Sequence, residues 1–247
     1  YNSHFVGVVA DFRNLAEIAK EHWFDNVDGV LFDLGLASWQ IDTGHQGLSF
    51  QFEVPLDMRL SPQEPSDFTR QEDDPSRWTE DVALARLVRT WRFRSAAEIL
   101  GNATEDELTK VFHILGDVSG SRGLARRIVE ARSSAPIERT SHLVKTVGTT
   151  NPKVLAPIFQ TLRILVNDEY GALVAGLGDA WSILKPGGTL AVISFHSGED
   201  RIVKRMMRSL ADATVSKPLT PSAEEQKKNP RSRSAILRIA RKTGRKP

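Results

Sequence analysis

LKPGGTLAVISFHSGEDRIVKR, residues 184–205, is the stretch of this chain that decides its fold. A Pro-Gly-Gly turn precedes an apolar run, which is followed by a polar corner and then by a helical pattern with a basic face. This order predicts a strand over 189–195 and a helix after it, which together form one βα unit. In open α/β sheets the ligand crevice lies outside the carboxyl ends of the strands. The side chains of Ser194, His196 and Ser197 are therefore expected at the ligand-binding edge of the sheet.

The sequence on both sides of this unit extends the pattern. Apolar residues that recur at three, four and seven positions predict one long helix over 162–184. Two apolar runs, 5–10 and 29–34, predict parallel strands joined by a crossover helix. Closing strands are expected at 213–217 and 235–241. The fold class indicated by this order of elements is α/β.

The helix after the polar corner is expected to begin at Ser197, whose hydroxyl fits an N-cap with Asp200 as its N3 partner. Its basic residues share one face, and apolar residues occupy the other. The basic set is Arg201, Lys204, Arg205 and Arg208. A solvated face is the ordinary explanation of such a stripe, but its place beside a ligand edge favours contact with a polyanion.

A block of different character separates the two α/β parts. Residues 41 to about 80 carry Gly, Pro and mixed charge and are expected to form loops. Helical patterns follow over 78–91 and after a capping box formed by Thr104 and Glu107. The predicted domains are an α/β domain, 1–40 and 163–247, and an inserted, mainly helical substrate-recognition subdomain, 41–162.

Composition narrows the function classes. The 247 residues include no cysteine, which excludes disulfides and thiolate metal sites and suits a reducing cytoplasm. The six histidines show no metal-ligand spacing, and no apolar run approaches the roughly 18 residues of a membrane span, so neither a metal nor a membrane is expected as a partner. The net charge is only +2, but 227–247 carries Lys and Arg without any acid. That segment is either a solvated tail or a contact for a polyanion.

Six segments carry a resemblance to a known family. In chain order they are FDLGLASWQIDTGHQGLSFQFEVPLDMRL (32–60), SAAEIL (95–100), ARRIVEAR (125–132), FQTLRILVNDE (159–169), the opening stretch and NPRSRSAILRIA (229–240). Together they resemble the bacterial 16S ribosomal RNA cytosine-N4 methyltransferases, called RsmH or MraW. The resemblance implies a class I S-adenosylmethionine-dependent methyltransferase fold, which is Rossmann-like, with an inserted helical subdomain. It also implies N4-methylation of a cytosine in the decoding region of small-subunit 16S ribosomal RNA.

The chain departs from this family at several points. The family's glycine-rich cofactor segment, around a Gly-Gly-His element, has no counterpart here. Its strand would lie at the sheet centre, beside the strand that ends in Asp33. We therefore expect a sheet that lacks its N-terminal strands, in a chain that is incomplete at its N-terminus and inactive alone. In smaller departures, Gly198 stands where the family has Leu, and 61–94 looks like an insertion.

The resemblance also assigns functions to single residues. It places Asp33 and Gln40 in the cofactor site and Phe12 against the adenine, with Asp11 as an acceptor for the adenine amine. A turn cap and a core Phe are the simpler explanations of Asp33 and Phe12. The catalytic candidates are Asp33, His196 and Asn167. The RNA-binding candidates are Arg163, Ser197, Arg201, Lys204, Arg205, Arg231 and Arg233.

Other functions remain open at this point. A non-catalytic RNA-binding or ribosome-assembly protein could use the same scaffold. A nicotinamide dehydrogenase is less favoured, because no GxGxxG follows a strand in this chain. His196 fits either a contact to a flipped base or a satisfied structural histidine. The oligomeric state is also open, with a homodimer as one alternative.

Overall fold

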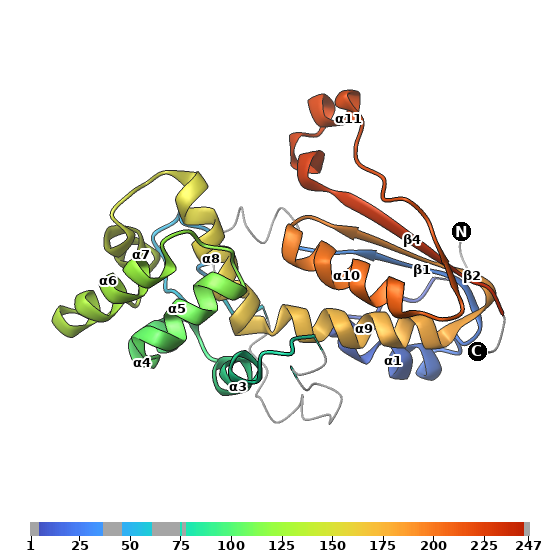
Figure 1. Ribbon diagram of the computed structural model, residues 1–247, viewed down its shortest axis with the longest axis horizontal. Coiled ribbons are helices and arrows are strands. Elements are labelled where there is room, and N and C mark those ends of the chain that lie inside the picture. The colour runs from blue at the N-terminus through green and yellow to red at the C-terminus, as the bar shows by residue number, and fades with distance from the viewer. Residues whose placement is uncertain (1–4, 37–45, 61–74, 76–77, 245–247) are drawn as a thin grey trace. The chain divides into compact units, whose positions relative to one another are not determined.

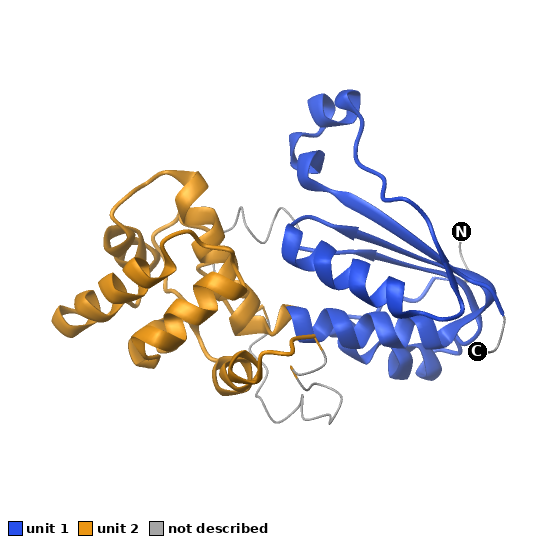
Figure 2. Cartoon of the chain, in the orientation of Figure 1, with its two compact units in different colours: residues 1–35, 170–247 blue, residues 36–169 orange. Residues whose placement is uncertain are grey.

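The computed structural model describes residues 5–36, 46–60, 75 and 78–244. The chain forms two compact units (Figure 2). Unit 1 comprises Tyr1–Gly35 and Tyr170–Pro247, and unit 2 comprises Leu36–Glu169. Unit 1 contains the sheet, whereas unit 2 is helical (Figure 1). The α/β class predicted from the sequence is thereby confirmed.

The sheet of unit 1 is mixed, with four strands in the order β1-β2-β4-β3. The strands are β1 (Val27–Asp33), β2 (Leu184–Ser194), β3 (Ala213–Val215) and β4 (Ile236–Lys242). β1 and β2 are parallel, so their carboxyl ends, Asp33 and Ser194, lie at the same edge of the sheet. β4 runs antiparallel to both β2 and β3, and its first residue, Ile236, pairs with Ser194 at that edge.

The helices of unit 1 lie before β1, on either side of β2 and between β3 and β4. They are η1 (Phe12–Asn14), α1 (Leu15–Glu21), α9 (Glu169–Ile183), α10 (Ser197–Ser209), α11 (Ala223–Lys228) and η5 (Pro230–Ser234). α10 buries Ile202, Val203 and Met207, while its basic side chains are exposed. α9 packs closely on η1 at Gly176, where a Cβ atom would lie only 2.7 Å from the ring of Phe12. This contact requires glycine at that point.

Unit 2 is built from helices that share one apolar core. They are α3 (Val82–Trp91), α4 (Ala96–Asn102), α5 (Glu105–Ile114), α6 (Ser121–Ser134), α7 (Thr140–Val147) and α8 (Pro152–Asn167). Phe112, Ile128 and Leu162 are fully buried within it. The predicted capping box at the start of α5 is confirmed, since Thr104 Oγ1 accepts from Glu107 N at 3.2 Å and Glu107 Oε2 accepts from Thr104 N at 2.8 Å. None of the helices within the described part of the chain has the length and apolar character that a bilayer-spanning segment requires.

The strand predicted over 5–10 is wrong. That segment forms no strand, and the side chains of Phe5 and Val9 are almost fully exposed. A strand needs a neighbour for its hydrogen bonds, and the outer edge of β1 pairs with none of the described residues. The apolar residues of 5–10 indicate a tendency to form a strand, but they do not show whether a neighbouring strand is present to pair with it.

The single long helix predicted over 162–184 is also wrong. α8 ends at Asn167, and α9 starts at Glu169, because Asp168 adopts a left-handed conformation with φ 47°. Its side chain is buried and accepts from Arg92 Nη1 at 2.8 Å. The apolar periodicity is similar on both sides of this residue, so periodicity does not reveal the break, where Asp168 contacts a residue 76 positions away.

The Pro-Gly-Gly segment before β2 is part of the strand and forms an irregularity in it. Val27 pairs with Leu184, and the next pair joins Gly29 to Thr189. Three extra residues of β2 are therefore accommodated, and Gly187 has a φ of 84°. The predicted turn is in fact a bulge.

Candidate functional site

The polar corner after β2 is organised by Glu199. Glu199 Oε2 accepts from Phe195 N at 2.9 Å and from His196 N at 3.4 Å, while His196 Nδ1 accepts from Glu199 N at 3.4 Å. The N-cap of α10 is therefore His196, with Glu199 at N3. The predicted cap at Ser197 with Asp200 is wrong by one residue, because Glu199 reaches back to these two amides from a buried position.

This cap also defines the state of the His196 ring. Because Nδ1 accepts a hydrogen bond, the neutral ring carries its proton on Nε2. Nε2 is buried and lies 3.1 Å from Glu199 Oε1, outside hydrogen-bond geometry for the described residues. The His196 side chain is only 17% exposed. In the structure His196 caps α10, which is what the structural one of the two alternatives predicts.

Asp200, which does not cap α10, connects that helix to β4. Its two carboxylate oxygens accept from Arg238 Nε at 2.7 Å and Nη2 at 2.9 Å. These hydrogen bonds raise the pKa of Arg238 above its usual value. Asp200 and Arg238 therefore form a bidentate ion pair between helix and sheet, with little solvent exposure on either side.

Asp33 lies at the carboxyl end of β1 with its side chain exposed. Among the described residues none forms a hydrogen bond or an ion pair with its carboxylate. Leu34 N still donates to Ile193 O of β2 at 3.0 Å, and Gly35 then has a φ of 100°. Among the described residues the Asp33 carboxylate therefore caps no backbone amide.

Two further cofactor candidates lie in η1 and just before it. Asp11 Oδ1 accepts from Arg13 N at 2.9 Å, and Asp11 Oδ2 pairs with Arg13 Nε at 2.9 Å. The ring of Phe12 is 39% exposed and contacts Phe32 edge to face, at 5.6 Å between centroids. Phe32 directly precedes Asp33 on β1. The exposed ring of Phe12 and the exposed carboxylate of Asp33 are therefore both close to the carboxyl end of β1. Asp11, by contrast, already has a buried partner.

Asn167 and Arg163 lie in unit 2 and have structural partners. Asn167 Oδ1 accepts from Leu60 N, and its Nδ2 donates to Met58 O and Arg163 O, each at 2.9 Å. Arg163 forms a bidentate pair with Glu169, with distances of 2.6 and 2.9 Å. Asn167 thereby fixes the loop that ends the PLDMR motif against α8. The sequence did not predict this because the partners of Asn167 in that loop are more than 100 positions away.

The remaining candidates fall into two groups. Gln40 lies outside the described residues. The exposed RNA-binding candidates of unit 1 are Ser197, Arg201, Lys204, Arg205, Arg231 and Arg233. Arg163 differs from them, because its side chain is only 14% exposed.

Sequence reasoning missed one feature of the PLDMR motif. Asp57 accepts from Arg59 Nε at 2.6 Å and Nη2 at 2.9 Å, and its backbone carbonyl accepts from Ala96 N. Met58, between them, is fully buried with a φ of 67°. An Asp followed two positions later by an Arg is the sequence pattern from which this ion pair could have been predicted. The motif thus forms a rigid loop in unit 2.

The ion pair in this loop gives a pH-dependent prediction. Arg59 lowers the pKa of Asp57 below 3.8, chiefly through its side-chain hydrogen bonds. A depressed pKa stabilises the fold above the unfolded value, and this stabilisation is lost as pH falls through the folded value. Asp57→Asn should therefore cost up to about 1 kcal/mol near neutral pH, since the pair is partly exposed, and progressively less below about pH 4. Urea unfolding across this range measures the difference, and Arg59→Gln should show the same trend. A cost that stays constant with pH would contradict the assignment.

Unit 1 thus combines an exposed carboxylate, an exposed aromatic ring and a basic helix at the carboxyl ends of two parallel strands. The protein is thus of the α/β class, in which ligands commonly bind at the carboxyl ends of the strands. The sequence model of the MraW methylase family matches residues 1–72 and 78–243. The chain therefore belongs to the MraW methylase family, as the sequence resemblance implied.

Individual relatives agree with this assignment. The chain is 38% identical over 237 residues to "Ribosomal RNA small subunit methyltransferase H" of Deinococcus radiodurans, covering 93% of this chain and 67% of the relative. It is 39% identical to the protein of the same name from Deinococcus deserti, covering 93% and 70%. The corresponding protein from Dechloromonas aromatica is 38% identical, covering 98% and 78%.

Proposed function

We propose that this chain is an S-adenosylmethionine-dependent methyltransferase of small-subunit ribosomal RNA. Its family, and the names of its relatives, support the enzyme class, the methyl donor and the substrate. The structural observation that carries the proposal is the exposed carboxylate of Asp33, which has no partner among the described residues and lies at the carboxyl end of β1, beside the corner of β2. The finer proposal is that the acceptor is N4 of a cytosine in the decoding region of 16S ribosomal RNA, in the cytoplasm.

The edge of unit 1 fits the cofactor in two respects. The half-exposed ring of Phe12 offers an aromatic face for adenine, and Asp33 offers a carboxylate to a cationic or hydroxyl-bearing ligand. Gln40 belongs to the same proposed set. Asp11 is a weaker member, because Arg13 already holds both of its oxygens. When bound, the cofactor supplies an electrophilic methyl group next to a sulfonium cation.

The protein's contribution to the reaction is alignment. The N4 amine of cytosine is a poor nucleophile, because its lone pair is delocalised into the ring. A carboxylate that accepts a hydrogen bond from this amine localises the electron pair and fixes the angle of attack. We assign this role to Asp33. His196 and Asn167 are positioning residues, since the first fixes the start of α10 and the second fixes the loop after Met58.

The sheet is proposed to be that of the class I methyltransferases, without its N-terminal strands. The insertion of unit 2 between β1 and α9 supports this, because the family carries its insert between the fourth strand and the helix that leads to the fifth. The face of β1 that carries Leu31 supports it as well, because this apolar side chain is 65% exposed. Unit 2 is proposed to be the substrate-recognition subdomain.

Methyl transfer tests the proposed function directly. Small ribosomal subunits are incubated with the full-length protein and S-adenosylmethionine labelled in its methyl group, and the labelled nucleotide is identified by nuclease digestion and mass spectrometry. We expect label on N4 of one cytosine of the 16S RNA. RNA binding without any label would instead support the ribosome-assembly alternative.

A further inference from the structure

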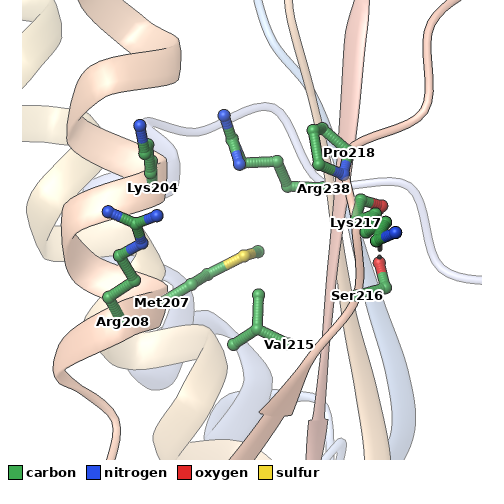
Figure 3. Close-up of a pocket in the computed structure, with 8 residues that line it drawn as sticks. All are labelled: Lys204, Met207, Arg208, Val215, Ser216, Lys217, Pro218 and Arg238. Atoms are coloured by element: carbon green, nitrogen blue, oxygen red, sulfur yellow. Dashed lines mark hydrogen bonds between the residues drawn. The ribbon is translucent and has the colours of Figure 1, made fainter.

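Unit 1 contains a cavity of about 290 Å³ between α10 and the segment that follows β3 (Figure 3). Lys204, Met207 and Arg208 line it from the helix. Val215, Lys217 and Arg238 line it from the sheet side. No carboxylate is among the residues that line it. The cavity is therefore surrounded by cations on an apolar floor.

Three of the cations that line this cavity lack a compensating acid. Arg238 is paired with Asp200, but Lys204, Arg208 and Lys217 form no ion pair with any residue in the described part of the chain. A solvated basic helix would explain Lys204 and Arg208 alone. It does not explain why Lys217, from a different element, lines the same cavity. Cations that converge on a hollow create a positive potential that an anion can relieve.

The floor of the cavity indicates what kind of anion fits. Met207, 1% exposed, and Val215, 38% exposed, point toward one another across it (Figure 3). An inorganic ion gains nothing from an apolar floor, whereas a sugar or base buries its apolar faces there. The combination fits a nucleotide unit, in which a phosphate and an apolar ring system are joined.

The position of the cavity relates it to the proposed active edge. α10 begins directly after the corner at His196, and Lys204 follows eight residues later, which is about 12 Å along a helix axis. An RNA strand that presents one base at the carboxyl ends of β1 and β2 can continue along the exposed face of α10. A nearby nucleotide of the same strand then reaches the cavity.

We propose that this cavity is a subsite for one nucleotide of single-stranded RNA, away from the base that is methylated. Its phosphate contacts Lys204, Arg208 and Lys217, and its sugar and base rest on Val215, beside the buried Met207. The inference rests on the proposed function in taking RNA as the substrate. It adds the place where the strand is held outside the reaction edge.

The test replaces the three uncompensated cations of the full-length protein together, as Lys204→Gln, Arg208→Gln and Lys217→Gln. The matched control removes the same charge from side chains on other elements of unit 1, as Lys20→Gln, Lys185→Gln and Lys228→Gln, the last two of which pair with acids. Binding of a fluorescent single-stranded RNA is measured by anisotropy at several salt concentrations. We expect the cavity variant to lose about 10-fold in affinity, and its salt slope to fall by at least about 0.7, the value for one phosphate contact on a single strand.

A second variant separates the cavity from a general basic surface. Val215→Trp fills the floor, keeps every charge and suits a strand. We expect it to lower RNA affinity several-fold with unchanged thermal unfolding. Full affinity in this variant, or equal affinity of the cavity and control variants, would overturn the proposal. Displacement of RNA by polyglutamate at an equal concentration of charge would also overturn it.

The same proteins show which proposal fails. Methyl transfer by the unsubstituted protein reports on the proposed function and does not depend on the cavity variants. If RNA binding depends on the cavity but no methyl group is transferred, the proposed function is wrong and the subsite is supported. If methyl groups are transferred but the cavity variants bind RNA normally, the proposed function is supported and the subsite is wrong.

Discussion

Asp33→Ala is expected to lower methyl transfer to small ribosomal subunits by the full-length protein by at least about 100-fold, the scale on which a positioned acceptor contributes. The reason is that the Asp33 carboxylate lies exposed at the end of β1 and hydrogen-bonds to none of the described residues. Its removal therefore leaves the fold unchanged within about 0.5 kcal/mol, as for other surface substitutions. RNA affinity should stay close to that of the unsubstituted protein, since the proposed strand contacts lie on α10. Labelled methyl transfer and RNA anisotropy measure the two effects on one preparation.

A carboxylate on the same strand provides the control for this variant. Asp28 lies near the other end of β1, is largely exposed and pairs with Lys185. Asp28→Ala removes an equal charge from β1 away from the proposed edge, so turnover should remain near normal. Asp33→Asn keeps one acceptor oxygen and should retain more activity than Asp33→Ala. Unchanged turnover in Asp33→Ala would remove Asp33 from the mechanism.

Gly198→Ala is expected to destabilise the protein by about 1–3 kcal/mol, the range for overpacking a buried site. A Cβ atom at Gly198 would lie 1.8 Å from the hydroxyl oxygen of Tyr170 and 3.2 Å from His196 Nδ1. Tyr170 is only 4% exposed, so its ring has little room to move. Helix propensity predicts the opposite sign, because Ala is favoured over Gly in helices by about 1 kcal/mol. The clash should prevail, and Gly198→Leu, which restores the family's residue, should be worse.

Two comparisons isolate the clash at Gly198. Gly178 lies on the exposed face of α9, where a Cβ atom would have no neighbour within 4 Å among the described residues, so Gly178→Ala should stabilise the protein by up to about 1 kcal/mol. Tyr170→Leu removes the atoms that meet the new side chain. In a double-mutant cycle it should recover much of the loss in Gly198→Leu. Denaturant unfolding gives all four free energies. If Gly198→Ala stabilised as much as Gly178→Ala, the clash would be disproved.

The parts of the fold that local sequence determines could be predicted. The Thr104 and Glu107 capping box is an interaction within one helical turn, and its residue types state it directly. The apolar run of β2 and the basic stripe of α10 follow from the periods of strand and helix. The edge at Asp33 and Ser194 followed in turn from the rule for parallel strands. Each of these depends on neighbours in sequence or on a general property of sheets.

The failures share a dependence on distant partners. The predicted long helix is interrupted at Asp168, which pairs with Arg92, and the cap of α10 is His196, while Asp200 pairs with Arg238 on β4. The hydrogen bonds of Asn167 to a loop more than 100 positions away could not be predicted either, and its catalytic role stays a prediction. Periodicity and spacing contain no information about such partners.

The sequence of unit 2 is inserted within the sequence of unit 1, and this order of translation determines when the strands can pair during synthesis. β1 ends at Asp33, and its parallel neighbour begins only at Leu184, so all of Leu36–Glu169 is translated between them. The helical unit is therefore translated in full before β2, the parallel neighbour of β1 among the described strands. Once unit 2 has folded, the flexible chain between β1 and β2 is shorter. The entropy lost in closing this loop, when the two strands pair, is then smaller. β4, which separates β2 from β3, is translated last of the four strands. The pairing of β1 with β2 at the proposed reaction edge can thus form only after unit 2 has been translated.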